Sequence, residues 1–257
     1  MLDAPNLITL KLETASLTVQ ELIPRELEKL NAFMKKCPNV THLELCFTNP
    51  CEFLGEFLAE NKLKLQSLRL PMAWDVNPSF LAQLRAQKDL AALTLLRPEE
   101  EDVEEAFTDP RHHELIDALS ERYNLRVLVF NEPVLANEFI RIIEANPLLE
   151  EVTLEPYGMD DEYLWRCASL RYLTSLQITS ETALPYSAFV TFMDLLDSDP
   201  HGRHDGFNLD VARQDIAFKL TRKQEDLLSA EFEKRFKGKV LIYYQDPVDM
   251  HESDFSD

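Results

Sequence analysis

The densest cluster of reactive side chains in this sequence is a run of acids. It comprises Glu99, Glu100, Glu101, Asp102, Glu104 and Glu105. A catalytic pair of carboxylates needs two different environments that drive their pKa values apart, and close neighbours on one loop lack that difference. Blocks of like charge are usually solvated. We therefore interpret this acidic insert (residues 99–105) as exposed surface, with a grip for a Lys- and Arg-rich partner as the alternative.

Histidines could supply ligands for a divalent metal. His112-His113 follows the acidic insert, and a polar loop carries His201-x-x-His204-Asp205. Structural zinc sites normally show two separated pairs of ligands, which neither cluster provides. Both clusters are therefore interpreted as parts of ordinary loops, and no metal site is predicted.

Nothing in the sequence predicts catalysis or a cofactor. No serine lies in a Gly-x-Ser-x-Gly elbow, and the five glycines form neither a Gly-x-Gly pair nor a phosphate loop. No Cys-x-x-Cys pair is present. This predicts free buried thiols in a reducing compartment, cytoplasmic or nuclear, for Cys37, Cys46, Cys51 and Cys167.

The charge balance limits the classes of partner. The 257 residues carry a formal net charge of −20. Such a chain lacks the basic footprint that nonspecific nucleic-acid binding or docking on anionic membranes requires. No apolar run approaches the roughly 18 residues of a membrane span, and no secretory signal is visible at the N-terminus. We expect a protein partner, and the charge allows a basic one.

A short pattern, apolar-x-x-apolar-x-apolar, recurs along the chain. Its starting positions are Leu7, Val40, Leu65, Leu90, Leu125, Leu149 and Leu173. Four of the six steps between them are 24 or 25 residues, within the range of leucine-rich repeats. Amphipathic stretches with apolar residues three and four apart lie between the patterns and indicate helices. The pattern predicts an α/β solenoid of about seven leucine-rich repeats, with a curved parallel sheet on the concave side and helices on the convex side.

Two phrases carry a family resemblance. CPNVTHLELCF at 37–47 and NPLLEEVTLEP at 146–156 resemble ribonuclease-inhibitor-like leucine-rich repeats, in particular those of fungal F-box proteins. The resemblance implies a module that recognises the substrates of a ubiquitin ligase. In that family a helical F-box precedes the repeats, whereas here the first repeat strand begins at Leu7 and no F-box is visible. We therefore expect a repeat fragment of a longer protein or a stand-alone relative.

The ends of the repeat array differ from each other. Repeat arrays need a polar capping unit at each end. None precedes Leu7, so we expect a partner or a symmetry mate to cover the N-terminal face. At the other end, FNLDVA and KVLIYYQ indicate strands, and TRKQEDLLSAEFEKRFK indicates a helix with a capping box at Thr221 and Gln224. The predicted domains are a solenoid at 1–200, a capping segment at 201–246 and an acidic disordered tail at 247–257.

The strand patterns predict which residues face the concave side. The first, fourth and sixth positions are buried, so the third, fifth and seventh point the other way. In the centre of this face the residues are apolar, and large apolar residues follow the strands nearby. An apolar patch with a polar rim is typical of a protein-binding site. The predicted binding residues are Trp74, Ala92, Leu96, Val127, Val129, Phe47, Met72 and Tyr157.

The sequence thus predicts a protein–protein interaction module without catalysis, similar to the substrate-recognition part of an F-box receptor. The alternative is an acidic chaperone or inhibitor that holds a basic protein with the acidic insert.

Overall fold

The computed structural model of the chain consists of two compact units. Unit 1 comprises Met1–Pro133 and Arg141–Leu149, and unit 2 comprises Val134–Ile140 and Glu150–Asp257. The residues that the structure describes are 6–18, 24–48, 51–71, 76–96, 110–121, 124–157, 160–179, 184–198, 204–215 and 219–245. The acidic insert, Met72, Trp74 and the predicted tail at 247–257 lie outside these residues.

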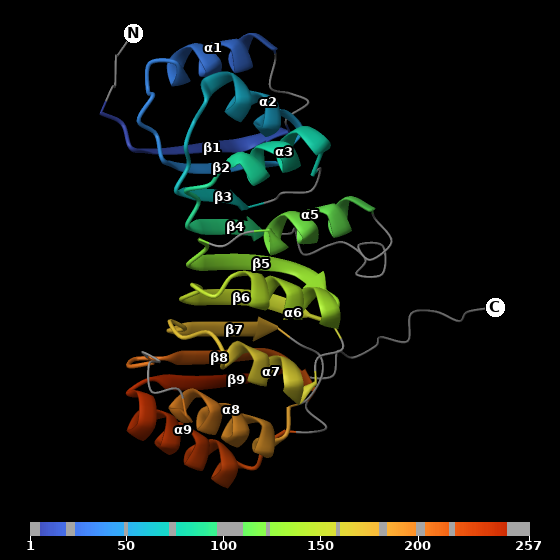
Figure 1. Cartoon of the computed structure of the whole chain (residues 1–257), viewed down its shortest axis with the longest axis vertical. Coiled ribbons are helices and arrows are strands. Elements are labelled where there is room, and N and C mark those ends of the chain that lie inside the picture. Colours follow the sequence, from blue (N-terminus) through green and yellow to red (C-terminus); the bar gives the residue numbers. More distant parts are fainter. Residues whose placement is uncertain are drawn as a thin grey trace, which may run out of the picture. The chain divides into compact units, whose positions relative to one another are not determined.

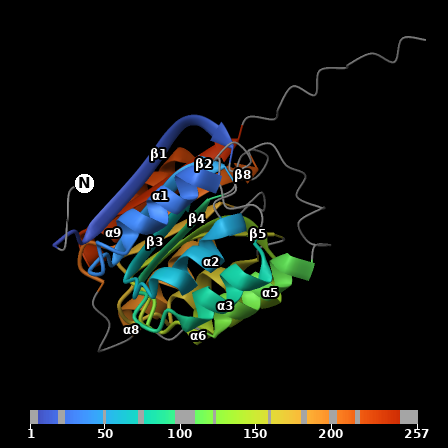
Figure 2. The same ribbon diagram turned by 90° about the horizontal axis from the view of Figure 1, so that it is seen from above.

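Unit 1 alternates strands with helices. Its strands pair in parallel and in the order of the sequence: β1 (Thr9–Thr18), β2 (His42–Thr48), β3 (Ser67–Pro71), β4 (Ala92–Leu96) and β5 (Val127–Val134). The helices described in this unit are α1 (Pro24–Met34), α2 (Cys51–Asn61), α3 (Pro78–Ala86) and α5 (Pro110–Ser120). Of these, α2, α3 and α5 lie on the same side of β3, β4 and β5 (Figure 2).

Unit 2 continues the same alternation. The chain enters it through α6 (Ala136–Ala145), whose residues are divided between the two units. Its strands, also parallel and in sequence order, are β6 (Glu151–Pro156), β7 (Ser175–Thr179), β8 (Asn208–Asp215) and β9 (Lys239–Gln245). The remaining helices, drawn beside these strands in Figure 1, are α7 (Asp161–Cys167), α8 (Tyr186–Ser198) and α9 (Arg222–Phe236).

The core follows the predicted alternation of side chains. In β2, Leu43 and Leu45 are buried while His42 and Glu44 keep part of their surface. The same alternation holds in β4, β6 and β7 and over residues 127–131 of β5. Side chains from successive repeats also meet in register, as Leu93 does with Leu128. The predicted fold class, an α/β leucine-rich-repeat solenoid, is confirmed.

Buried polar side chains form hydrogen bonds between successive repeats. They occupy the same position in their repeats, three residues before the first apolar residue of the pattern. There Asn146 donates from Nδ2 to the carbonyls of Leu119 at 3.1 Å and Ile142 at 2.8 Å. Gln87 donates to the Leu63 carbonyl at 3.0 Å. These side chains satisfy backbone groups that the turns leave inside the protein.

The predicted elements after residue 200 are present. Strands β8 and β9 extend the parallel order beyond β7, and Thr221 and Gln224 form the predicted capping box of α9. The end of α9 differs in detail from a glycine-terminated helix, because the left-handed residue is Lys237 (φ 51°). Gly238 serves a close approach instead, since a Cβ there would lie 1.6 Å from the Phe207 carbonyl oxygen. Whether residues 201–246 act as a cap stays a prediction.

Candidate functional surface

The strand face turned away from the helices, here called the open face, is organised by the strand register of unit 1. Residues in register form rows that cross the strands. One row contains Ser67, Ala92 and Val127, and the next contains Arg69, Thr94 and Val129. Because the ladder hydrogen bonds fix the backbone, each row presents its side chains at set positions.

Aliphatic side chains occupy the open face of β4 and β5. Ala92, Leu96, Val127 and Val129 are all half-buried, whereas their helix-facing neighbours, such as Leu128, are fully buried. These four residues, here called the aliphatic strip, were predicted to face this side. The register places Val127 beside Ala92. The strip thus has rigid support and an accessible surface, which are the properties of a docking patch.

A charged cluster lies on the same face, on β1 to β3. The Glu44 carboxylate lies 3.3 Å from Lys11 Nζ and 3.5 Å from Arg69 Nε. It also accepts a hydrogen bond from the Cys46 thiol at 3.4 Å. Partial burial alone would raise the pKa of Glu44. The bonds from Cys46 and Lys11 and the charges of Lys11 and Arg69 outweigh it, so the pKa lies below its usual value.

The open face of unit 2 has a different chemistry. Strands β6 and β7 present polar side chains, and Thr153 donates to Gln177 at 3.5 Å. Asp210 on β8 is in register with Gln177, and burial raises its pKa. Among the described side chains of this face, large apolar groups reappear on β9, where Leu241 is 46% exposed and Tyr243 is 52% exposed.

The predicted binding residues outside the strip divide into two groups. Tyr157 follows β6 in unit 2 and is 51% exposed. Phe47 belongs to β2, but its side chain lies outside the described residues, as do Met72 and Trp74. Their part in a common surface therefore stays a prediction.

The two histidine clusters turn out to lie partly in the core. His112 belongs to α5 rather than to a loop, and its Nδ1 lies 3.0 Å from Glu132 Oε2. Both side chains are almost fully buried, and the imidazole stacks on Phe130. His204 is also buried, and its Nδ1 lies 3.0 Å from the Leu173 carbonyl oxygen. These contacts give both histidines structural roles that the sequence did not reveal.

Metal and thiol chemistry have little support in the described residues. They contain no group of three His, Cys, Asp or Glu side chains that could hold a metal ion. Cys37 and Cys167 are buried free thiols, as predicted, and Cys46 is a half-buried one. Burial raises the pKa of Cys167 far above its usual value, which keeps that thiol protonated and unreactive.

Comparisons with known proteins add the following. No protein-family model matches the sequence, and no curated protein matches it. The structure is similar to internalin C2 of Listeria monocytogenes, with a TM-score of 0.38 and 16% sequence identity, covering 81% of this chain and 74% of that one. A likeness at this score bears on neither function nor partner. The fold assignment rests on the strand register and the burial pattern. Among the described residues, no helix combines the length and apolar character needed to cross a membrane.

Proposed function

We propose that this chain is a protein-binding module whose partner docks on the open face of β4 and β5. The main observation behind this proposal is that part of the surface of four side chains in unit 1 is exposed to solvent: Ala92, Leu96, Val127 and Val129. At the corresponding positions of β6 and β7, unit 2 has polar side chains. An apolar patch that is half-exposed on a rigid sheet gains free energy when a partner covers it.

The charged cluster supplies the polar rim of this surface. Arg69 and Thr94 are in register, so the cluster borders the aliphatic strip directly. Rim charges of this kind contribute little affinity, but they discriminate between partners and speed up association. We expect Arg69 to set selectivity and the strip to set affinity.

Several finer proposals extend this one. The partner would be the substrate of an F-box-type ubiquitin ligase, bound without catalysis in a reducing compartment, cytoplasmic or nuclear. Phe47, Met72, Trp74 and Tyr157 would add aromatic and thioether contacts, because such side chains dominate binding hot spots. A partner or a symmetry mate would cover the N-terminal face, where Ile8 is 56% exposed beside β1.

The alternative proposal is an acidic chaperone or inhibitor that holds a basic protein through the acidic insert. The net charge of −20 favours it. The two proposals differ in salt dependence, since exposed charge attraction is screened within about 8–10 Å at physiological salt and apolar docking is not.

The test is capture of partners by the tagged chain from its native cell lysate, at physiological and at high salt. The variants are Val129→Asp in the strip and its matched control Gln177→Asp in unit 2. A salt-resistant partner that Val129→Asp loses and Gln177→Asp keeps would support the proposal. A partner that high salt releases, and that is lost on neutralising residues 99–105, would support the chaperone. Equal capture by both variants would contradict docking on the strip.

A further inference from the structure

The last strand of unit 2 leaves an apolar groove open. Among the strands in the described residues, β9 comes last in the pairing order, so only its β8 edge is paired there. Its helix-facing residues Val240 and Ile242 keep part of their surface, whereas Leu209 and Val211 in the same positions of β8 are 1% and 0% exposed. In β8 the next repeat covers these positions. In β9 nothing among the described residues does.

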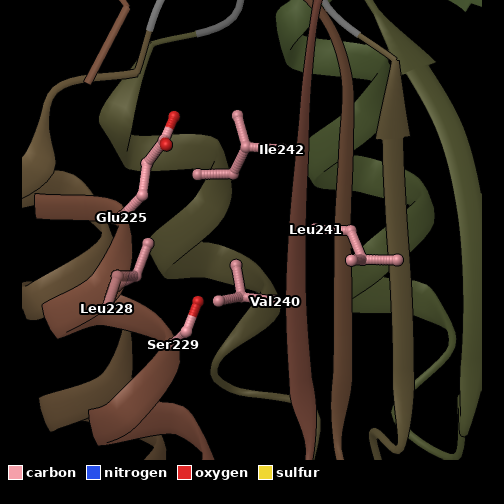
Figure 3. Close-up of a pocket in the computed structure, with 6 residues that line it drawn as sticks. All are labelled: Glu225, Leu228, Ser229, Val240, Leu241 and Ile242. Carbon is pink, nitrogen blue, oxygen red and sulfur yellow. The ribbon is translucent and has the colours of Figure 1, made fainter. Parts of the chain in front are cut away.

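A cavity of about 200 Å³ lies along this edge, between α9 and β9. In Figure 3, Glu225, Leu228 and Ser229 extend from α9 toward Val240 and Ile242, while Leu241 points to the other side of the strand. The cavity is smaller than the sites that usually bind small molecules, but it can hold one or two aliphatic side chains. It therefore fits part of a polypeptide.

The backbone of β9 is ready to pair with an added strand. The Lys239 N–H donates to the Phe207 carbonyl at 3.2 Å, so Lys239 bonds toward β8. Because successive residues of a strand direct their N–H and C=O groups to opposite sides, Val240 and Ile242 direct theirs outward. An extended segment on this edge would gain main-chain hydrogen bonds from those groups and would place alternate side chains in the cavity.

The negative charge at the groove favours a segment that carries a basic residue. Of the six lining residues only Glu225 is ionisable. The Tyr244 hydroxyl accepts a hydrogen bond from the Leu220 N–H at 3.2 Å, and burial together with the nearby Glu225 carboxylate raises the pKa of Tyr244, which places Glu225 near the end of β9. A lysine or arginine of an incoming strand would find an acceptor there.

The chain's own C-terminal segment and a second copy are poorer matches by charge. Residues 246–257, DPVDMHESDFSD, contain five acids and no lysine or arginine. That segment would bring further negative charge beside Glu225. Two copies of a chain with a net charge of −20 also repel one another.

We propose that the β9 edge binds an extended segment of another protein as an added strand, with aliphatic side chains in the cavity and a lysine or arginine two residues further on, beside Glu225. This site lies within unit 2, and its test does not depend on the function proposed for the aliphatic strip.

The experiment measures binding of four fluorescent, end-blocked hexapeptides to the full chain by fluorescence anisotropy. The peptides are TVTVTK, TVTVTR, TVTVTE and TVTVTT, which place both valines and the last residue on one face of a strand. We expect the Lys and Arg peptides to bind about tenfold more tightly than the Glu peptide, as a charge-assisted hydrogen bond implies. N-methylating the amides that face β9 should abolish binding, because charge attraction alone does not suffice.

Three variants locate the binding site. Ser229→Phe fills the groove from an exposed position, so it should remove peptide binding without unfolding the chain. Glu225→Gln should remove the preference for Lys over Glu. Glu233→Gln, the same change at an exposed position of α9 away from the cavity, should leave it intact.

Four outcomes would overturn the proposal. The first two are peptide binding that Ser229→Phe does not weaken and no measurable binding to the wild-type chain. Another is a dimer in sedimentation that Ser229→Phe dissociates, which would assign the groove to a second copy. The last is binding that appears only after removal of residues 246–257, which would assign the groove to the chain's own C-terminal segment.

Discussion

Two carboxylates hold the same place on the open faces of the two units, and their pKa values shift in opposite directions. Glu44 on β2 stands between Lys11 and Arg69, and its pKa is lowered. Asp210 on β8 stands between Gln177 and Leu241, and its pKa is raised. Both carboxylates lie on parallel strands at the same position of the repeat, so the side chains around each one, including Cys46 beside Glu44, produce the difference. The open face can therefore change its chemistry without altering the fold.

The helix-facing layer shows no such variation: in both units, apart from β1, β9 and Glu132, its described residues are apolar and buried. Phe130 and Ile178 are both 0% exposed, while their neighbours Val129 and Gln177 lie on the open face. We infer from this contrast that the helix-facing side of each strand stabilises the fold and that the open face is available for binding.

The largest effect is expected in the helix-facing layer. Phe130→Ala should lower the free energy of unfolding by about 3–5 kcal/mol, because it leaves a cavity in the core. Val129→Ala, one residue away on the open face, should cost less than about 1 kcal/mol. Urea denaturation followed by circular dichroism measures both. Similar losses in the free energy of unfolding for the two variants would show that the open face contributes as much to stability as the helix-facing layer.

The next effect tests the His112–Glu132 contact in the core of unit 1. His112→Ala should destabilise the chain by about 3 kcal/mol, because it leaves a cavity in the core and removes the imidazole that lies against the buried carboxyl group of Glu132. The conservative control Glu132→Gln, which keeps a side chain able to hydrogen-bond, should cost less. If His112→Ala were neutral in urea denaturation at pH 7, the pair would have no structural role.

A smaller effect is expected at the polar position that ties repeats together. Asn146→Ala removes the donor to two carbonyl groups and should cost about 1–3 kcal/mol. Asn137 is an exposed asparagine of α6, so Asn137→Ala provides the control. Thermal unfolding of the two variants gives the comparison, and equal melting temperatures would refute the bridging role.

The smallest effect is the pH dependence of the two carboxylates. A lowered folded-state pKa means that Glu44 adds stability at neutral pH and loses it as pH falls through that pKa. A raised pKa means that Asp210 costs stability once pH rises above the unfolded value of about 3.9. Both contributions should be below about 1 kcal/mol, because neither residue is fully buried.

The check is urea denaturation between pH 3 and pH 7. Glu44→Gln should be less stable than wild type at pH 7, and Asp210→Asn should be more stable, with both differences shrinking toward pH 3. The same sign for both variants would show that the side chains around these two carboxylates do not control their pKa values.

Much of the fold could be predicted, because seven strands begin two residues after Leu7, Val40, Leu65, Leu90, Leu125, Leu149 and Leu173. Strands β8 and β9 could be predicted only as separate strands. Two residues before β8 and β9, where the other strands have the first apolar residue of the pattern, the chain has Gly206 and Lys237, both with positive φ. The apolar pattern that reveals the other repeats is therefore missing. A turn replaces the apolar residue there while the strands keep their register.

The candidate surface was only partly predictable. The alternation of side chains along a strand placed the aliphatic strip correctly. The link from Lys11 through Glu44 to Arg69 depends on the register between three strands that lie far apart in the sequence. The His112–Glu132 pair likewise joins a helix to a strand, and no local pattern encodes that contact.

The most direct test of the proposed binding surface is hydroxyl-radical footprinting of the chain with and without its captured partner. Mass spectrometry then reports the oxidation of individual side chains. We expect Leu96, Val127 and Val129 to be protected by the partner, while Tyr172 in unit 2, which is 43% exposed, stays unchanged. Unchanged oxidation of the three strip residues, with protection confined to unit 2, would contradict the account.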